Sequence, residues 1–209
     1  MPKNYNSIAS YYYALSCSVF QRSIIKAQQY LIEFITANSK ILIAGGGTGW
    51  ILEEISKMKL ENLQIIYVEK SFKMIEFSKK RKYGNLKVEF IHTGIEKYKT
   101  DELFDFIITP FLFDNFTEKK IQYVFKKMDE LLKQKGFWLH ADFVNDKANK
   151  KIWQQYLLKT MYYFFRITTN IETQELIDMR PYFTEKYELI SQQFYYKKFI
   201  QAIAFRKIK

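Results

Sequence analysis

The sequence predicts a doubly wound α/β domain in which helices cover both faces of a mostly parallel β-sheet. The first observation is an unbroken apolar run, 41–44, that leads directly into the glycine-rich stretch 45–49. A continuous apolar run suits a central parallel strand, because both faces of such a strand are buried. The second observation is that apolar strand segments alternate with amphipathic helical segments from residue 40 to residue 143, which predicts βα units. The third is a closely spaced pair of strand patterns at the end of the chain, which indicates an antiparallel hairpin.

Length and composition indicate a single globular domain. The chain has 209 residues, of which 48% are hydrophobic and 18% aromatic, enough to bury a sizeable core. Its single cysteine, Cys17, excludes an intrachain disulfide and suits a reducing compartment. The segment 9–20 is interpreted as a helix rather than a signal segment, and no uncharged apolar run reaches the length of about 18 residues that a membrane span needs. We therefore expect a cytoplasmic protein that does not span a membrane.

The chain is basic, with a formal net charge of +11 and an isoelectric point near 9.4. Only five of its 33 basic residues are arginines, although guanine readout and bidentate phosphate binding prefer arginine. The lysines are scattered along the predicted helices and form no long basic block. This pattern favours a solvated surface and disfavours nucleic acid, and it leaves an anionic lipid or substrate as an alternative.

The first predicted elements are a helix over 22–37 and a strand over 40–44. After the glycines that follow this strand, a helical pattern begins, carried by Ile51, Leu52, Ile55 and Met58. Glycine lets the backbone turn sharply and approach a ligand where a Cβ would clash. The N-terminus of the next helix directs its free N–H groups at that ligand. The stretch therefore predicts a nucleotide-type binding loop.

The spacing of the glycines discriminates between nucleotide-binding motifs. Gly45, Gly47 and Gly49 form G-x-G-x-G. A dinucleotide-binding loop needs a small residue at position 50 so that helix and strand pack closely, but that residue is Trp50. A phosphate-binding loop of the G-x-x-x-x-G-K-S/T type is absent, because no lysine and hydroxyl residue follow at the required places. Neither of these two classes fits.

An acidic residue ends the next strand. The apolar strand 64–68 is followed by Glu69, which lies 20 residues beyond Gly49. A carboxylate at this place can accept hydrogen bonds from both hydroxyls of a ribose. The loop and this acid together therefore predict a site for a ligand that contains a nucleoside.

The following segments continue the alternation of helix and strand. Ser71 is the predicted N-cap of a helix that runs to about Lys82. Further strands are predicted over 86–92, 104–109 and 137–143. Between the last two strands, Thr117 opens a helix and Gly136 closes it.

The last part of the chain is expected to hold a helical insertion over 145–170 and a hairpin. The helix 147–167 has a broad apolar face, for which packing on the sheet, a substrate lid, a dimer surface and peripheral contact with a membrane or lipid all stay open. A short helix over 173–180 is expected to stop at Pro181. Strands over 187–196 and 199–205 then form the hairpin.

The G-x-G-x-G loop together with Glu69 resembles the class I S-adenosylmethionine-dependent methyltransferases. Residues 5–13, Y-N-S-I-A-S-Y-Y-Y, are similar to the segment ahead of this loop in small-molecule methyltransferases of the quinone-biosynthesis type. The resemblance implies a Rossmann-like, mostly parallel seven-stranded sheet with a C-terminal antiparallel hairpin. It also implies one domain, 1–209, made of an N-terminal helical cap, a cofactor-binding core, a helical insertion or lid and the hairpin, over 1–39, 40–143, 145–185 and 186–209.

The resemblance implies that the cofactor is S-adenosylmethionine and that no metal is required. The residues expected to bind the cofactor are Gly45, Gly46, Gly47, Thr48, Gly49, Glu69, Lys70, Met74, Gly94, Ile95 and Pro110. Tyr12 and Phe111 are expected to line the substrate pocket. Two positions depart from the family pattern, because Ile43 and Gly94 stand where the family often has acids, although Glu96 could replace the second one.

Asp114 and Asp142 are the candidates for a catalytic base. Asp142 lies at the carboxyl end of the predicted strand 137–143, at the edge where open parallel sheets bind ligands, and a helix-cap or loop acid is the alternative interpretation of this residue. The alternation of strand 137–143 puts His140 on the same face as Asp142, and we interpret His140 as a buried core residue.

The loop after strand 104–109 argues against methylation of nucleic-acid bases. Its sequence, T-P-F-L over 109–112, lacks the acid or amide and the second proline that amino-methylases of bases carry there. Cytosine C5 methylases need a cysteine at this loop, and the only cysteine is Cys17.

The sequence therefore predicts a methyltransferase that acts on a small molecule, with an apolar or aromatic acceptor as one option. Two alternatives stay open. One is a non-catalytic binding module with the methyltransferase fold, and the other is an RNA methyltransferase, which the positive charge permits. A monomer and a homodimer both fit the sequence.

Overall fold

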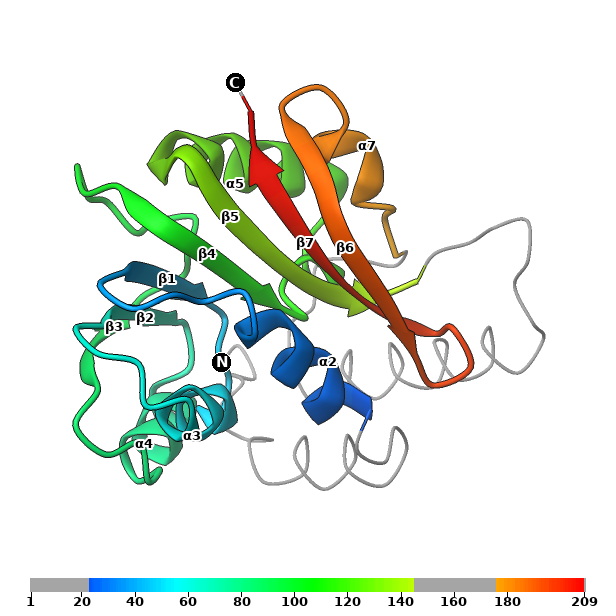
Figure 1. Ribbon diagram of the computed structural model, residues 1–209. Helices are drawn as coiled ribbons and strands as arrows, with labels where there is room; N and C mark the ends of the chain where they lie inside the picture. The colour runs from blue at the N-terminus through cyan, green and yellow to red at the C-terminus, as the bar shows by residue number, and fades with distance from the viewer. Residues whose placement is uncertain (1–22, 145–175, 209) are drawn as a thin grey trace.

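The computed structural model describes residues 23–144 and 176–208. A seven-stranded sheet with the order β3-β2-β1-β4-β5-β7-β6 forms its centre (Figure 1). The strands are β1 (Lys40–Ala44), β2 (Gln64–Glu69), β3 (Lys87–His92), β4 (Phe104–Pro110), β5 (Leu132–Phe143), β6 (Tyr187–Tyr195) and β7 (Ile200–Lys207). Neighbouring strands are parallel except at β7, which runs antiparallel to β5 and β6. The predicted fold class, with its C-terminal antiparallel hairpin, is confirmed.

Alternating residues of β1 explain why this strand is apolar throughout. Ile41 and Ile43 belong to the core cluster that includes α2 (Ser23–Ile32) and α3 (Trp50–Lys57). Leu42 and Ala44 belong to a second cluster, which includes α5 (Glu118–Leu131) and α7 (Arg180–Phe183). All four side chains are fully buried. A polar side chain at any of these four positions would be buried away from water, whichever face of the sheet it lies on, and this burial would cost free energy.

The remaining helices are α4 (Phe72–Lys79) and the 3₁₀ turn η2 (Phe113–Asn115). Ser71 caps α4 as predicted, because its hydroxyl accepts a hydrogen bond from the Met74 N–H at 3.3 Å. Helices α2 and α4 end several residues earlier than predicted. Thr117 precedes α5, but its side chain makes no capping hydrogen bond. In the part of the chain that the structure describes, no helix has the length and apolarity to cross a membrane.

Several sequence predictions concern residues outside the described ranges. These are the segment 5–13 with Tyr12, the helix 9–20 with Cys17, and the helix 147–167 with its possible lid, dimer or membrane role. The division of the chain into a cap, core, insertion and hairpin therefore stays a prediction.

The prediction that Gly136 ends a helix is wrong. Helix α5 ends at Leu131 and β5 begins at the next residue, so Gly136 lies inside a strand. A Cβ at Gly136 would come within 2.9 Å of the Lys133 carbonyl oxygen and 3.0 Å of the Asp105 carbonyl oxygen. The glycine therefore permits the close approach of β4 to β5 rather than the end of a helix.

The prediction that Pro181 stops a helix is also wrong. Residues 176–179 are not helical, and α7 begins at Arg180 with Pro181 in its first turn. Proline is tolerated there because first-turn N–H groups have no partner within the helix, and its fixed φ already suits the helix. Pro181 thus starts a helix.

A buried carboxylate joins α5 to the last two strands. Asp129 is 5% exposed and accepts hydrogen bonds from Lys186 Nζ at 2.8 Å and from Tyr187 Oη at 2.7 Å. Lys207 Nζ lies 3.2 Å from the same carboxylate and donates to the Leu132 carbonyl, also at 3.2 Å. Burial works to raise the pKa of Asp129, but hydrogen bonds from Lys186, Tyr187 and Lys207 outweigh it and hold the pKa below its usual value.

Asp129→Asn should lower the free energy of unfolding by about 3 kcal/mol at pH 7, because Lys207 would keep a buried charge without its carboxylate. Urea denaturation of both proteins measures this difference. The stabilisation from a lowered folded-state pKa is present in full above the unfolded pKa of about 4 and is lost as the pH falls through the folded pKa. The difference between the two proteins should therefore shrink below about pH 4.

Glu130→Gln provides the matched control, since Glu130 is the exposed neighbour of Asp129. Its unfolding free energy should stay within about 0.5 kcal/mol of the original protein. Equal stability of Asp129→Asn and the original protein at pH 7 would contradict the proposed energetic role of the network.

Candidate functional site

A cavity of about 110 Å³ lies at the carboxyl ends of β1, β2 and β4. Strand β1 lies between β2 and β4, so the chain order reverses at this point of the sheet. Open α/β sheets bind ligands in the crevice at such a reversal. The predicted site residues that line the cavity are Gly45, Gly47, Glu69, Lys70, Met74, Gly94, Ile95, Pro110 and Phe111.

Three of the predicted loop residues do not line this cavity. Gly46 lies against the Tyr67 ring of β2, and Thr48 contacts Arg81, the second residue after α4. A Cβ on Gly49 would lie 2.7 Å from the Ser78 backbone, and the φ of Gly49 is +74°, so only glycine fits there. These three residues fix the shape of the loop through contacts outside the cavity.

Glu69 connects the end of β2 to the glycine loop. Its Oε2 accepts a hydrogen bond from the Gly47 N–H at 3.1 Å, and its Oε1 accepts one from the Ser71 N–H at 2.8 Å. The residue is 8% exposed, and burial raises the pKa of Glu69 against the opposing effects of these N–H groups and of Lys70. Each carboxylate oxygen has a second acceptor position, so Glu69 can hold the loop and accept from a ligand at the same time.

Two hydroxyl groups hold the carbonyl of the same glycine. Tyr67 Oη donates to the Gly47 oxygen at 3.0 Å, and Ser78 Oγ also lies 3.0 Å from that oxygen. Burial, and then the charge of Glu69, raise the pKa of Tyr67 far above its usual value, so its hydroxyl keeps the proton that it donates. Both polar groups of the Gly47 backbone therefore have fixed partners.

The turn after β3 forms another side of the cavity. The Gly94 carbonyl accepts from the Lys97 N–H at 2.9 Å and from the Tyr98 N–H at 3.1 Å. The Glu96 carboxylate folds back over Gly94, where a Cβ would collide with Glu96 Oε2. Lys120 Nζ, from α5, lies 3.5 Å from Glu96 Oε1. The absence of a side chain at position 94 thus makes room for the carboxylate of residue 96, which lines the cavity.

The segment after β4 forms the apolar side. Phe111 has a φ of +55°, donates its N–H to the Ala141 carbonyl at 2.7 Å and packs its ring against Phe143. The Asn115 side-chain amide donates to the carbonyls of Phe111 and Leu112, at 3.2 Å and 3.3 Å. The lining residues that the sequence did not single out are Val68, Thr93, Leu112, Asn115 and Phe116. Their place at or after the carboxyl ends of strands is the one signal that could have found them.

The two predicted catalytic acids lie together but do not line the cavity. Asp142 is 2% exposed; its Oδ1 accepts from the Phe143 N–H at 2.8 Å, and its Oδ2 has no partner within the described residues. Burial raises the pKa of Asp142 to about 7, although the backbone N–H groups of Phe143, Asp114 and Phe113 act against it. Burial and the charge of Asp142 also raise the pKa of Asp114 well above its usual value. The pair therefore retains a proton near neutral pH.

His140 is a buried core residue, as predicted. Thr109 Oγ1 accepts from Trp138 Nε1 at 3.0 Å and lies 3.2 Å from His140 Nδ1. Which of these two groups donates depends on the tautomer of the ring, and His140 Nε2 has no partner within the described residues. Burial lowers the pKa of His140 to about 4, so the ring is neutral at pH 7.

Comparison with known proteins finds a family match over part of the chain and solved structures of similar fold. Residues 41–136 match the model of the methyltransferase domain family. The N-methyltransferase NodS of Bradyrhizobium japonicum, solved with S-adenosylhomocysteine, has a TM-score of 0.61 at 13% identity, over 91% of this chain and 89% of its own. The 1,6-didemethyltoxoflavin-N1-methyltransferase of Burkholderia thailandensis has a TM-score of 0.63 at 11% identity, over 97% and 85%.

A similar fold is also found in a further solved structure. The methyltransferase from Aquifex aeolicus described as dependent on S-adenosylmethionine has a TM-score of 0.60 at 15% identity, over 96% of this chain and 98% of its own. At these identities the likeness shows the fold alone. No curated protein matches the chain by sequence.

Asp142→Asn should raise the free energy of unfolding by about 2 kcal/mol at pH 8, because it removes a charge that burial disfavours. The raised pKa means that the protonated carboxyl stabilises the fold fully below the unfolded pKa of about 4, and that this contribution is lost as the pH rises through about 7. The difference in free energy of unfolding between Asp142→Asn and the original protein should therefore grow from about pH 4 to about pH 7 and level off above pH 7. Urea denaturation at pH 4.5, 6 and 8 measures it.

Asp101→Asn is the control for this prediction, since Asp101 is exposed. Its effect on the free energy of unfolding should stay within about 0.5 kcal/mol at each pH. A gain in Asp142→Asn that is the same at pH 4.5 and pH 8 would show that the charge of Asp142 is not its source.

Proposed function

We propose that this chain, whose match to the methyltransferase domain family covers residues 41–136, is a class I S-adenosylmethionine-dependent methyltransferase that transfers the methyl group of that cofactor to a small molecule. The main observation behind the proposal is the fixed backbone of Gly47, whose N–H donates a hydrogen bond to Glu69 in the lining of the cavity. A buried carboxylate that orders a glycine loop and still has acceptor positions suits the ribose of a nucleoside.

Three sides of the cavity match the parts of the cofactor. We assign the ribose hydroxyls to Glu69 and the adenine ring to Met74 and Ile95, both of which are 4% exposed and line the cavity. We assign the exocyclic amine of adenine to Glu96, whose carboxylate occupies the space that the family acid would take. The cofactor supplies an electrophilic methyl group on a sulfonium centre.

The apolar side of the cavity suits the transfer itself. Phe111, Leu112 and Phe116 exclude water there, and a dry site favours loss of the sulfonium charge in the transition state. Holding the acceptor in line with the methyl group supplies a large part of the rate. An apolar or aromatic acceptor fits this side best, and the Burkholderia neighbour was solved with the small molecule 1,6-didemethyltoxoflavin bound.

We propose Asp114 and Asp142, which lie together beside the cavity rather than in its lining, as the groups that take the proton of the acceptor. Asp114 lies on η2 directly before Asn115, which lines the cavity, and its carboxyl accepts from the Asn115 amide. A base with a pKa of about 7 can take a proton near neutral pH and release it afterwards. Asp142, the more buried member, then sets the proton affinity of the pair.

A second candidate is a non-catalytic binding module of the same fold. Ile43 favours it, because a position that often carries an acid in the family is fully buried in the core here. This candidate and the enzyme differ in whether the cofactor binds and turns over.

Calorimetric titration of the protein with S-adenosylmethionine, S-adenosylhomocysteine and NADH tests the proposal. We expect dissociation constants on the order of micromolar for both sulfur compounds, the range of ordinary enzyme ligands, and no binding of NADH. Release of S-adenosylhomocysteine is then measured against a panel of small aromatic amines and phenols. Absence of binding by both sulfur compounds would favour the binding module.

Glu69→Gln should weaken binding of S-adenosylmethionine about 10- to 100-fold, because hydrogen bonds to a charged acceptor contribute about 1.5–3 kcal/mol. The glutamine amide also cannot accept from both the Gly47 and Ser71 N–H groups in the present geometry. Calorimetry of the two proteins under the same conditions gives the ratio.

The matched control is Glu76→Gln, an exposed glutamate on α4 outside the cavity. Its affinity should stay within about twofold, in keeping with a surface substitution. If Glu69→Gln bound the cofactor as tightly as this control, the assignment of Glu69 to the ribose would be wrong.

A further inference from the structure

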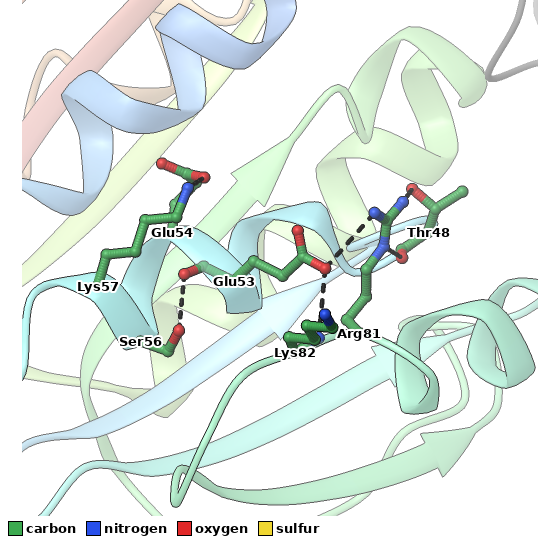
Figure 2. A network of polar contacts seen from close by, with 7 residues as sticks. All are labelled: Thr48, Glu53, Glu54, Ser56, Lys57, Arg81 and Lys82. Carbon is green, nitrogen blue, oxygen red and sulfur yellow. Dashed lines mark hydrogen bonds and ion pairs between the residues drawn. The ribbon is translucent and has the colours of Figure 1, made fainter.

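Arg81 reaches the glycine loop from the end of α4. It follows the C-cap residue Lys80, and its Nε donates to the Thr48 carbonyl at 3.0 Å (Figure 2). Its Nη2 donates to the Thr48 hydroxyl at 3.3 Å. The side chain does not line the cavity. Arg81 therefore contacts the loop from outside the lining of the cavity.

Glu53 fixes the direction of the guanidinium. It lies in the first turn of α3, the helix that the loop opens, and its Oε1 is 3.6 Å from Arg81 Nη1. The same oxygen accepts from the Lys82 N–H at 3.3 Å. Figure 2 shows the Arg81 guanidinium between Glu53 and Thr48. The end of α4 is thus tied both to the loop and to the start of α3.

Thr48 lies between two glycines that other contacts already fix. Gly47 is held through its N–H by Glu69 and through its carbonyl by two hydroxyls, and Gly49 packs against α4. Glycines lose more conformational freedom than other residues when they are ordered. Contacts that order the loop before a ligand arrives reduce the entropy that is lost on binding. Arg81 supplies such contacts at the peptide between Thr48 and Gly49 and at the Thr48 hydroxyl.

We propose that Arg81 is a positioning residue for S-adenosylmethionine, which holds Thr48 so that the cofactor meets an already ordered loop. The identity of the ligand rests on the proposed function, whereas the order of the loop exists without any ligand. Two N–H groups of one planar guanidinium meet the carbonyl and the hydroxyl of one residue. Lysine offers a single ammonium group and cannot reproduce this geometry.

Amide hydrogen exchange of the ligand-free protein tests the order of the loop. Arg81→Ala should speed exchange of the Gly47 and Gly49 amides about tenfold, because both are hydrogen-bonded only while the loop keeps its shape. Lys80→Ala is the matched control, since it removes an exposed cation one residue away and should leave both amides unchanged. Unchanged exchange in Arg81→Ala would overturn the inference.

Calorimetric titration with S-adenosylmethionine, well below the unfolding temperature of each variant, tests the effect on binding. We expect Arg81→Ala to bind about tenfold more weakly, Arg81→Lys to lie between it and the original protein, and Lys80→Ala to match the original within about twofold. Thr48→Val removes only the hydroxyl contact. Its effect should be smaller, and it should add little to Arg81→Ala, because the two substitutions remove the same contact.

The two measurements separate the possible failures. Faster loop exchange in Arg81→Ala with unchanged affinity would overturn the inference, since the loop order would then not matter for binding. An original protein that binds no S-adenosylmethionine would overturn the proposed function, and with it the cofactor role of Arg81, even if Arg81 orders the loop. Faster exchange together with weaker binding, partly rescued by Arg81→Lys, is the result that supports the inference.

Discussion

The parallel pairing of β1 with β2 is the constraint on which the rest of the site depends. The register sets Ala44 opposite Val68, and the Gly45 N–H donates to the Val68 carbonyl at 2.9 Å, one residue beyond the end of β1. This contact brings the glycine loop beside Glu69, which can then accept from the Gly47 N–H. A slip of one residue would turn Glu69 to the other face of the sheet and separate it from the loop. Helices on the two faces fix this register. Alternate residues of β1 are buried in two different core clusters, one on each face, so a slip of one residue would exchange their surroundings.

The cavity has two kinds of surface, and the order of the sheet separates them. The side formed by β2 and the turn after β3 carries the carboxylates of Glu69 and Glu96. The side formed by the segment after β4 carries Phe111, Leu112 and Phe116. Because β1 lies between β2 and β4, the glycine loop stands where these two sides meet. A polar nucleoside and an apolar methyl acceptor can therefore occupy neighbouring parts of one crevice, which is what the proposed reaction requires.

Buried carboxyl groups in this protein differ in their partners rather than in their burial. Asp129 and Asp142 are 5% and 2% exposed, yet the pKa of Asp129 is lowered and that of Asp142 is raised. Two lysines and a tyrosine hydroxyl surround Asp129, whereas Asp142 faces another carboxyl group and has only backbone donors. The first arrangement stabilises the fold, and the second destabilises the charged form. A group kept partly protonated near neutral pH is suited to chemistry rather than to stability.

The sequence by itself determined the elements whose causes are local. Strands β1 to β4 lie within one residue of their predicted bounds, because apolar runs and flanking turn residues mark them directly. The glycine loop and Glu69 were recognisable for the same reason, since their chemistry depends on spacing along the chain. The N-cap Ser71 was also predicted correctly, whereas the helix ends assigned to Gly136 and Pro181 from residue type alone were wrong.

Only the tertiary structure decided which distant residues meet. Arg81 contacts Thr48 across 33 positions of the chain, and Lys207 contacts Asp129 across 78. It also brought Asp114 and Asp142 together beside the cavity rather than in its lining. Such contacts follow from the order of strands in the sheet and from the packing of helices on it, and no periodicity in the sequence encodes them. The physical reason is that spacing along a strand or helix fixes only near neighbours, whereas the folding of the whole chain fixes the partners of a buried charge.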